Sequence, residues 1–159
     1  AVPRLGIEEF HWWGEGLHGV GRRGYATVFP QAINLASTFD TELVRKVADI
    51  ISTEARAKHN EAFKAGQKGR NTGLTFWSPN INIARDPRWG RTQETYGEDP
   101  CLTSRIGASF VRGLQGDDPD NLKVAACAKH FAVHSGPEKN RHIDNIKPSK
   151  KDLVDKLEQ

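Results

Sequence analysis

The sequence has few cysteines, no long apolar run and little net charge, and each absence excludes a class of protein. Two cysteines among 159 residues cannot build a disulfide framework, and neither Cys101 nor Cys127 has metal-ligand spacing. No apolar run approaches the roughly 20 residues of a membrane-spanning helix. The opening stretch, AVPRLGIEEF, shows no signal peptide, because it lacks a basic region followed by an apolar one. The composition, 36% hydrophobic and 27% charged, is typical of a soluble globular domain.

The positive charge is too weak and too scattered to indicate nucleic-acid binding. The net charge is +3, and the one basic cluster comprises Lys147, Lys150 and Lys151 near the end of the sequence. A nucleic-acid interface would need a denser basic face with aromatic residues between the charges. We therefore expect a solvated tail there, with neither a nucleic-acid nor a membrane partner. Cys127 falls in a predicted strand, where a buried thiol packs as a small apolar group.

Strand-like and helix-like patterns alternate along the sequence. Strands are predicted at 5–13, 74–83 and 122–131, and helices at 41–65, from Asp99 to about Leu114, and after a capping box of Ser149 and Asp152. The apolar face expected for the helix at 41–65, which Asp40 can cap, comprises Leu43, Val47, Ile50, Ile51, Ala55 and Ala62. Such alternation predicts an α/β fold with mainly parallel strands. Since a TIM barrel typically takes roughly 250 residues, the predicted fold class is a partial TIM (β/α)8 barrel, about the first half.

Polar clusters follow the three predicted strands. GEGLHG contains Glu15 and His18, ARDPRWGRTQETYGED carries arginines and carboxylates around Trp89, and the third cluster pairs Lys129 with His130. Structural roles compete with functional ones: a solvated loop for the first cluster, loop-pinning ion pairs for the second and a core histidine for His130. Lys129 is the hardest to explain structurally, because a lysine ending a strand of small residues is rarely buried without a partner.

If these clusters meet at one strand-end face, their chemistry suits a sugar. The aromatic surface available to such a site comprises Trp12, Trp13, Trp77 and Trp89. Sugar C–H faces pack on aromatic rings, and sugar hydroxyls form hydrogen bonds with charged planar groups. A phosphate site would instead need a glycine-rich loop that opens a helix, and GVGRRG does not follow a strand in that way.

Three longer motifs resemble the N-terminal barrel domain of glycoside hydrolase family 3, of the β-glucosidase and β-xylosidase type. The motifs are ATVFPQAINLASTFD, LTFWSPNINIARDPRWGRTQETYGEDP and VAACAKHFAVHSGPEKNRH. The resemblance covers about residues 2–146 and leaves 147–159 as a divergent tail. Within the family, WWGEGLHGV and GPEKNRH favour the xylosidase branch.

The resemblance also implies roles for individual residues. The residues that match sugar-binding positions are Glu15, Arg91, Lys129 and His130. Asp86 and Arg88 are expected to organise their loop. Because neighbouring side chains alternate in a regular strand, a bulge or a cis peptide bond must turn Lys129 and His130 toward the same ligand. The resemblance favours the cis bond.

The activity implied by the resemblance is hydrolysis of terminal β-linked glucose or xylose from oligosaccharides, with retention of configuration. An aspartate nucleophile and a separate acid/base carry out this reaction. The family places the nucleophile in a later motif like VMSDW and the acid/base in a following domain, and this sequence has neither. We therefore expect no catalytic residue, metal or cofactor in this chain, and Glu15 and Glu94 are not assigned catalytic roles.

The sequence is accordingly interpreted as a fragment that is inactive alone. Its expected partners are an oligosaccharide or β-glycoside substrate and the missing C-terminal part of the barrel with the domain that follows. The resemblance implies a periplasmic or secreted complete protein. The alternative is a non-catalytic carbohydrate-binding remnant, which a downstream SDW aspartate would argue against.

Overall fold

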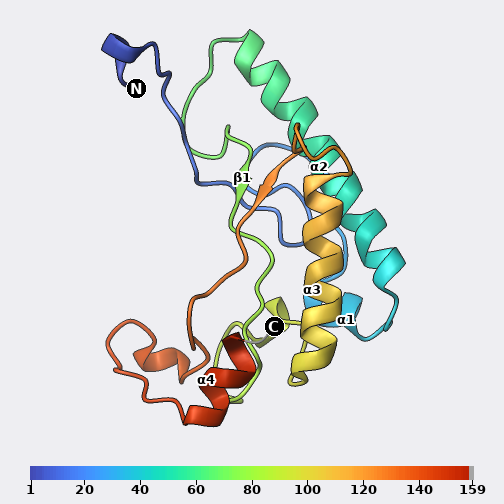
Figure 1. Ribbon diagram of the computed structural model, residues 1–159, viewed down its shortest axis with the longest axis vertical. Helices are drawn as coiled ribbons and strands as arrows, with labels where there is room; N and C mark the ends of the chain where they lie inside the picture. The colour runs from blue at the N-terminus through green and yellow to red at the C-terminus, as the bar shows by residue number, and fades with distance from the viewer. Residues whose placement is uncertain (158–159) are drawn as a thin grey trace.

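The computed structural model describes residues 1–157, in which long helices pack beside a small parallel sheet (Figure 1). The helices are α1 (Ala32–Ala36), α2 (Thr41–Lys64), α3 (Pro100–Gln115) and α4 (Lys150–Leu157), the strands are β1 (Thr75–Phe76) and β2 (Ala125–Ala126), and 3-10 turns lie at Pro3–Leu5, Thr92–Glu94 and Glu138–Asn140. The two strands run parallel, with Thr75 opposite Ala125 and Phe76 opposite Ala126. Because α3 connects them, the arrangement is the β/α unit expected of a parallel sheet.

The predicted helices form where their caps were expected. Asp40 Oδ1 accepts hydrogen bonds from the backbone N–H groups of Glu42 and Leu43, 3.0 and 2.9 Å away, and thereby satisfies two free donors of α2. Asp99 caps α3 in the same way. Ser149 caps α4: its Oγ accepts from the Asp152 N–H at 3.1 Å. Five-residue α1 was not predicted.

The apolar core lies between α2, α3 and the sheet. Its largest members include Ile51, Phe76, Ile106, Phe110 and Leu114, all nearly inaccessible to solvent. The predicted α2 face was partly wrong, because Leu43 and Ile50 are 41% and 44% exposed. Val44 and Ala48 are buried instead, so the packed stripe is centred about one residue further along the helix than expected.

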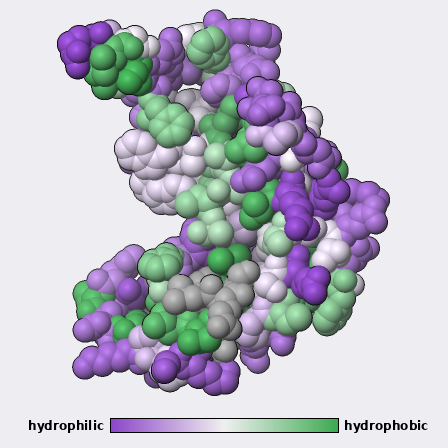
Figure 2. All heavy atoms as spheres, in the orientation of Figure 1, coloured by the Kyte–Doolittle hydropathy of each residue, from purple (hydrophilic) through white to green (hydrophobic). Residues whose placement is uncertain are grey.

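A glycine allows α2 and α3 to approach closely. A Cβ atom at Gly113 would overlap the backbone carbonyl of Arg45 and touch the Ala48 side chain. At this crossing the Ser52 hydroxyl donates to the Gly113 carbonyl, 3.2 Å away. Hydrophilic side chains cover the outer edge of the molecule along α2, on the right in Figure 2.

The strands are much shorter than predicted. The prediction for residues 5–13 was wrong: the chain there is irregular, and Gly14 is the first residue to bridge β1, at Phe76. The other two predicted strands shrink to two residues each, although the bridge between Asn80 and Lys129 continues their alignment. Pro79 accounts for part of this, since proline donates no backbone hydrogen bond to a ladder. Cys127 is exposed, contrary to the prediction of a buried thiol.

The backbone between Lys129 and His130 departs from regular β geometry as predicted, because the peptide bond that joins them is cis. A second non-proline cis bond joins Phe131 to Ala132, and Ser78–Pro79 is also cis. No helix in residues 1–157 is both long enough and apolar enough to cross a membrane.

Candidate functional site

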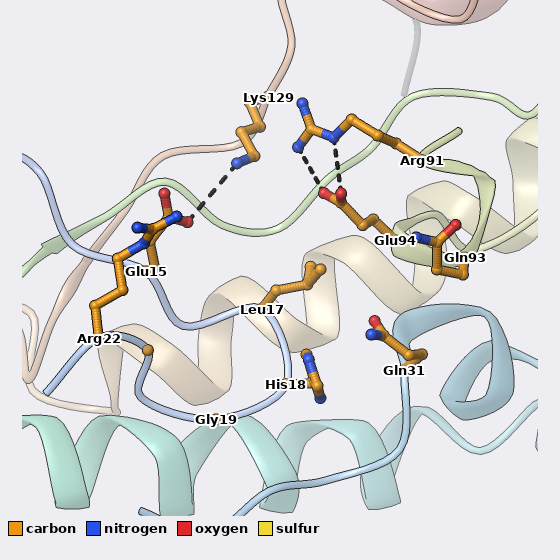
Figure 3. A pocket seen from close by; sticks show the side chains of 11 residues that line it. Glu15, Leu17, His18, Gly19, Arg22, Gln31, Arg91, Gln93, Glu94 and Lys129 are labelled. Atoms are coloured by element: carbon orange, nitrogen blue, oxygen red, sulfur yellow. Dashed lines mark hydrogen bonds and ion pairs between the residues drawn. The ribbon is translucent and has the colours of Figure 1, made fainter. Parts of the chain in front are cut away.

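The three polar clusters meet at one cavity of about 360 Å³ (Figure 3). Glu15 follows the segment that bridges β1, Arg91 and Glu94 lie beyond β1, and Lys129 lies beyond β2. The other polar side chains of the wall belong to His18, Arg22, Gln31 and Gln93. The predicted convergence at a strand-end face is therefore confirmed for these clusters.

Arg91 is held in the cavity wall by two hydrogen bonds to Glu94. Its Nε donates to Oε1 at 2.7 Å and its Nη2 to Oε2 at 2.6 Å, and both side chains are 21% exposed. The bonds to Glu94 raise the pKa of Arg91 above its ordinary value. Burial alone would raise the pKa of Glu94, but the hydrogen bonds and charge of Arg91, with the charge of Lys129, outweigh burial and lower it. Both groups are therefore charged at neutral pH, and this interaction fixes the guanidinium plane.

Lys129 lies between this pair and Glu15. Its Nζ is 3.9 Å from Glu15 Oε2, and its side chain is 16% exposed. Burial lowers the pKa of Lys129, while the carboxylate of Glu15 acts in the opposite direction. The expectation that a strand-end lysine has a partner is confirmed, and the solvated-loop interpretation of Glu15 was wrong.

His130 contacts the same network through Arg91 but does not line the cavity. Its Nε2 is 3.2 Å from Arg91 Nη1, and its Nδ1 is 2.7 Å from Asn82 Oδ1. Burial, followed by the positive charges of Arg91, His134 and Lys129, lowers the pKa of His130 to about 3. His130 is therefore a neutral hydrogen-bonding group at neutral pH that contacts Arg91. Its sugar-binding role stays a prediction, beside the alternative of a satisfied core histidine.

The aromatic part of the predicted site was wrong. None of the four tryptophans lines the cavity. Trp89 is 2% exposed and meets the ring of His134 edge-on, whereas Trp12 faces solvent. Trp13 and Trp77 stack on each other with ring centroids 4.7 Å apart, because they flank the bridge of Gly14 with Phe76.

Asp86 and Arg88 lie outside the cavity wall. Arg88 Nε donates to Asp86 Oδ1 at 2.9 Å and its Nη2 to Oδ2 at 2.7 Å. These bonds lower the pKa of Asp86 to about 2. The pair closes a turn of the loop, which is the organising role expected of it.

Several members of the site were not predicted from the sequence. Asn82 beneath His130, and Gln31 and Gln93 in the wall, were not singled out. The polar NIN run inside an otherwise apolar predicted strand was the available signal for Asn82. His18, expected in a solvated loop, lines the cavity and bonds through Nδ1 to the Phe29 carbonyl at 2.8 Å. Within residues 1–157, no group of three or more His, Cys, Asp or Glu side chains is arranged to hold a metal ion.

Residues 10–157 match the family model described as the glycosyl hydrolase family 3 N terminal domain. This chain belongs to glycosyl hydrolase family 3. The match confirms the resemblance carried by the three motifs, and it also extends through α4.

Curated relatives and solved structures agree with this assignment. A xylan 1,4-β-xylosidase of Xylanibacter ruminicola is 52% identical over 149 residues, which are 92% of this chain and 17% of the relative. The solved structure of a family 3 exo-β-xylosidase in complex with a xylobiose aziridine probe is 40% identical, with a TM-score of 0.74, over 89% of this chain and 19% of that one. A mutant β-glucosidase of Listeria innocua in complex with laminaribiose is 34% identical, with a TM-score of 0.75. This match covers 96% of this chain and 19% of the β-glucosidase.

The chain thus spans less than a fifth of the length of these relatives. The structural matches confirm the predicted fold class, a partial α/β barrel.

Proposed function

We propose that this chain supplies the sugar-recognition part of a retaining exo-glycosidase that releases terminal β-linked xylose or glucose. The observation that carries the proposal is the shared cavity, in which Arg91 and Lys129 face Glu15. A sugar hydroxyl both donates and accepts hydrogen bonds, so cationic donors beside a carboxylate acceptor satisfy both of its functions. Glu15, Arg91, Lys129 and His130 are the proposed binding residues.

The size of the cavity supports a small ligand. Small-molecule sites occupy roughly 300–1,000 Å³, and about 360 Å³ lies at the lower end of that range. A terminal sugar unit fits this scale better than a long oligosaccharide. The wall is mainly polar, so hydroxyl recognition, rather than stacking on aromatic rings, provides most of the proposed specificity.

The carboxylates of the cavity are suited to binding and not to proton transfer. Glu94 has both oxygens bound by Arg91 and a lowered pKa, whereas a general acid in this chemistry needs a raised one. Glu15 faces the ammonium group of Lys129. We therefore place the aspartate nucleophile and the acid/base of the retaining reaction outside these 159 residues, in the rest of the barrel and the following domain.

Xylose is the sugar that the comparisons favour. The relative at 52% identity is named a xylosidase, whereas the Listeria innocua β-glucosidase is 34% identical. The xylosidase-like motifs WWGEGLHGV and GPEKNRH support the same choice.

The full-length protein that carries this chain tests the proposal. We expect it to release nitrophenol from an aryl β-xyloside faster than from the β-glucoside. NMR should detect the β-anomer of the released sugar first, as retention of configuration requires. Arg91→Lys should raise KM for both substrates. If the protein binds xylose but hydrolyses neither glycoside, the proposed glycosidase activity is contradicted, and the alternative of a carbohydrate-binding remnant is supported.

A further inference from the structure

Asn82 lies outside the cavity wall and is a fully buried polar side chain whose groups contact the segment that carries His130. Its Oδ1 is 3.0 Å from the backbone nitrogen of His130 and 2.7 Å from the ring Nδ1. Its Nδ2 lies 3.4 Å from the carbonyl of Ala132. Asn80 supports Asn82 from the other side, because Asn80 Oδ1 accepts from the Asn82 backbone N–H at 3.0 Å.

These contacts determine where the proton of the His130 ring lies. A backbone N–H can only donate, so the Asn82 atom that it meets must be the amide oxygen. The amide nitrogen then faces the Ala132 carbonyl, which can only accept. Because an amide oxygen cannot donate, the Nδ1 atom 2.7 Å from it must carry a hydrogen.

The other ring nitrogen meets a group that can only donate. Arg91 Nη1 is 3.2 Å from Nε2, and a guanidinium has five N–H donors, no acceptor, and keeps its protons in proteins. Nε2 must therefore present its lone pair. The charged and titratable groups around the ring are Arg91, Lys129, His134 and Glu94, and the first three oppose a positive charge on it. The ring of His134 is 4.4 Å away, centroid to centroid.

We infer that Asn82 is a positioning residue that holds His130 as the neutral Nδ1–H tautomer, so that the Nε2 lone pair accepts from Arg91 and fixes the guanidinium in the wall of the sugar site. This inference rests on the proposed function. Arg91, held by Glu94 and His130, then donates its remaining N–H groups to a sugar hydroxyl oxygen.

The direct test is neutron crystallography of the full-length protein at pH 7. The expected map shows a hydrogen on His130 Nδ1 and none on Nε2. A hydrogen on Nε2, alone or together with one on Nδ1, overturns the inference. This measurement needs no substrate, so it decides the tautomer even if the protein hydrolyses neither glycoside, the result by which the proposed function itself would fail.

A charge substitution tests the role in function. Asn82→Asp keeps an acceptor for both His130 N–H groups but places a carboxylate beside the ring, and an opposite charge at this distance raises a histidine pKa by roughly 1–3 units. We expect the acid limb of kcat/KM to move to higher pH by about 1 unit or more, with activity largely recovered above the limb. Asn34→Asp, an exposed asparagine on α1, is the matched control and should leave the profile unchanged. A loss of kcat/KM that is uniform across pH would show that Asn82 has a merely structural role and would overturn its role in function. If the Asn82→Asp variant does not fold, the neutron map decides the tautomer of His130.

Discussion

Arg91 and Glu94 form a two-point hydrogen-bonded pair within a single turn of 3-10 helix, at the edge of the cavity that also contains Lys129. The pair leaves Arg91 Nη1 to meet His130. The guanidinium is thus fixed on one side by a carboxylate and on the other by an imidazole. Its orientation is set before any ligand arrives, which reduces the ordering cost of binding.

The first prediction concerns this preorganisation. Glu94→Gln removes the negative charge and one of the two acceptors of Arg91, so the guanidinium loses its fixed plane. A hydrogen bond to a charged group contributes about 1.5–3 kcal/mol, so kcat/KM of the full-length protein should fall by about tenfold or more, mainly through KM. Glu98→Gln, on the same loop but outside the cavity wall, is the control. Unchanged kinetics for Glu94→Gln would exclude the positioning role.

The second prediction is that the 159-residue chain alone is inactive. Its carboxylates in the cavity are engaged by Lys129 and Arg91, and positioning groups by themselves form no covalent glycosyl intermediate. Nitrophenol release from aryl β-xylosides and β-glucosides is the measurement. Turnover at about 1 per second or more, typical of enzymes, would refute the expectation.

The third prediction concerns association of the isolated chain. Its sheet has two strands of two residues each, and Phe131 is 91% exposed. Unpaired strand edges and exposed apolar side chains promote association. Light scattering should show concentration-dependent oligomers and calorimetry a broad transition. A monodisperse monomer that melts sharply would contradict this.

The fourth prediction concerns the pH dependence of stability. The folded state holds the pKa of His130 near 3, below the unfolded value of about 6.5. The unfolded state therefore binds more protons between these values, so the contribution of His130 is fully present above pH 6.5 and is lost as pH falls toward 3. The melting temperature of His130→Gln should decline less steeply from pH 6.5 to 4 than that of the wild type. His142→Gln, on an exposed loop, should follow the wild-type slope, and identical slopes for all three proteins would refute the argument.

The fifth prediction concerns the crossing of α2 and α3. Gly113→Ala would force a methyl group onto the Arg45 carbonyl, and overpacking of this kind costs about 1–3 kcal/mol. In Gly107→Ala, on the same helix, the new methyl group approaches two side chains and no backbone atom: Ile81 at 3.2 Å and the Tyr96 ring at 3.8 Å. Gly113→Ala should therefore lower the melting temperature of the full-length protein more than Gly107→Ala does. The reverse order would show that the helices do not cross closely at Gly113.

The parts of the fold that the sequence predicts well are those with local causes. Asp40 and Asp99 cap helices through atoms two or three residues away, so their patterns can be recognised without tertiary information. The segment at 5–13 was misassigned because an apolar run becomes a strand only if a neighbouring segment pairs with it along its length. Residues 5–13 meet isolated partners instead: Ile7 bridges Val2, and the Trp13 carbonyl accepts from the Asn71 N–H.

The candidate site likewise has residues that the sequence predicts and residues that depend on tertiary contacts. Motif resemblance identified Glu15, Arg91, Lys129 and His130, whose convergence the structure then shows. Asn82 was missed because its partner lies 48 positions away, a separation that no local pattern encodes. The tryptophans were misplaced because residue type predicts an affinity for sugar rings but not the direction in which a ring points.

The bridge of Asn80 with Lys129 has a consequence for how the site is assembled. Ile81 N–H donates to the Lys129 carbonyl at 2.7 Å, and one step further along both segments the Asn82 side chain holds His130. A slip of one residue between these segments would turn each side chain to the opposite face. The slip would therefore break two contacts together, that of Asn82 with His130 and that of Lys129 with Glu15. In a ladder with so few backbone bonds, the polar contacts of the site therefore help to select the register, and the chain aligns its strands partly through side chains of the proposed sugar site.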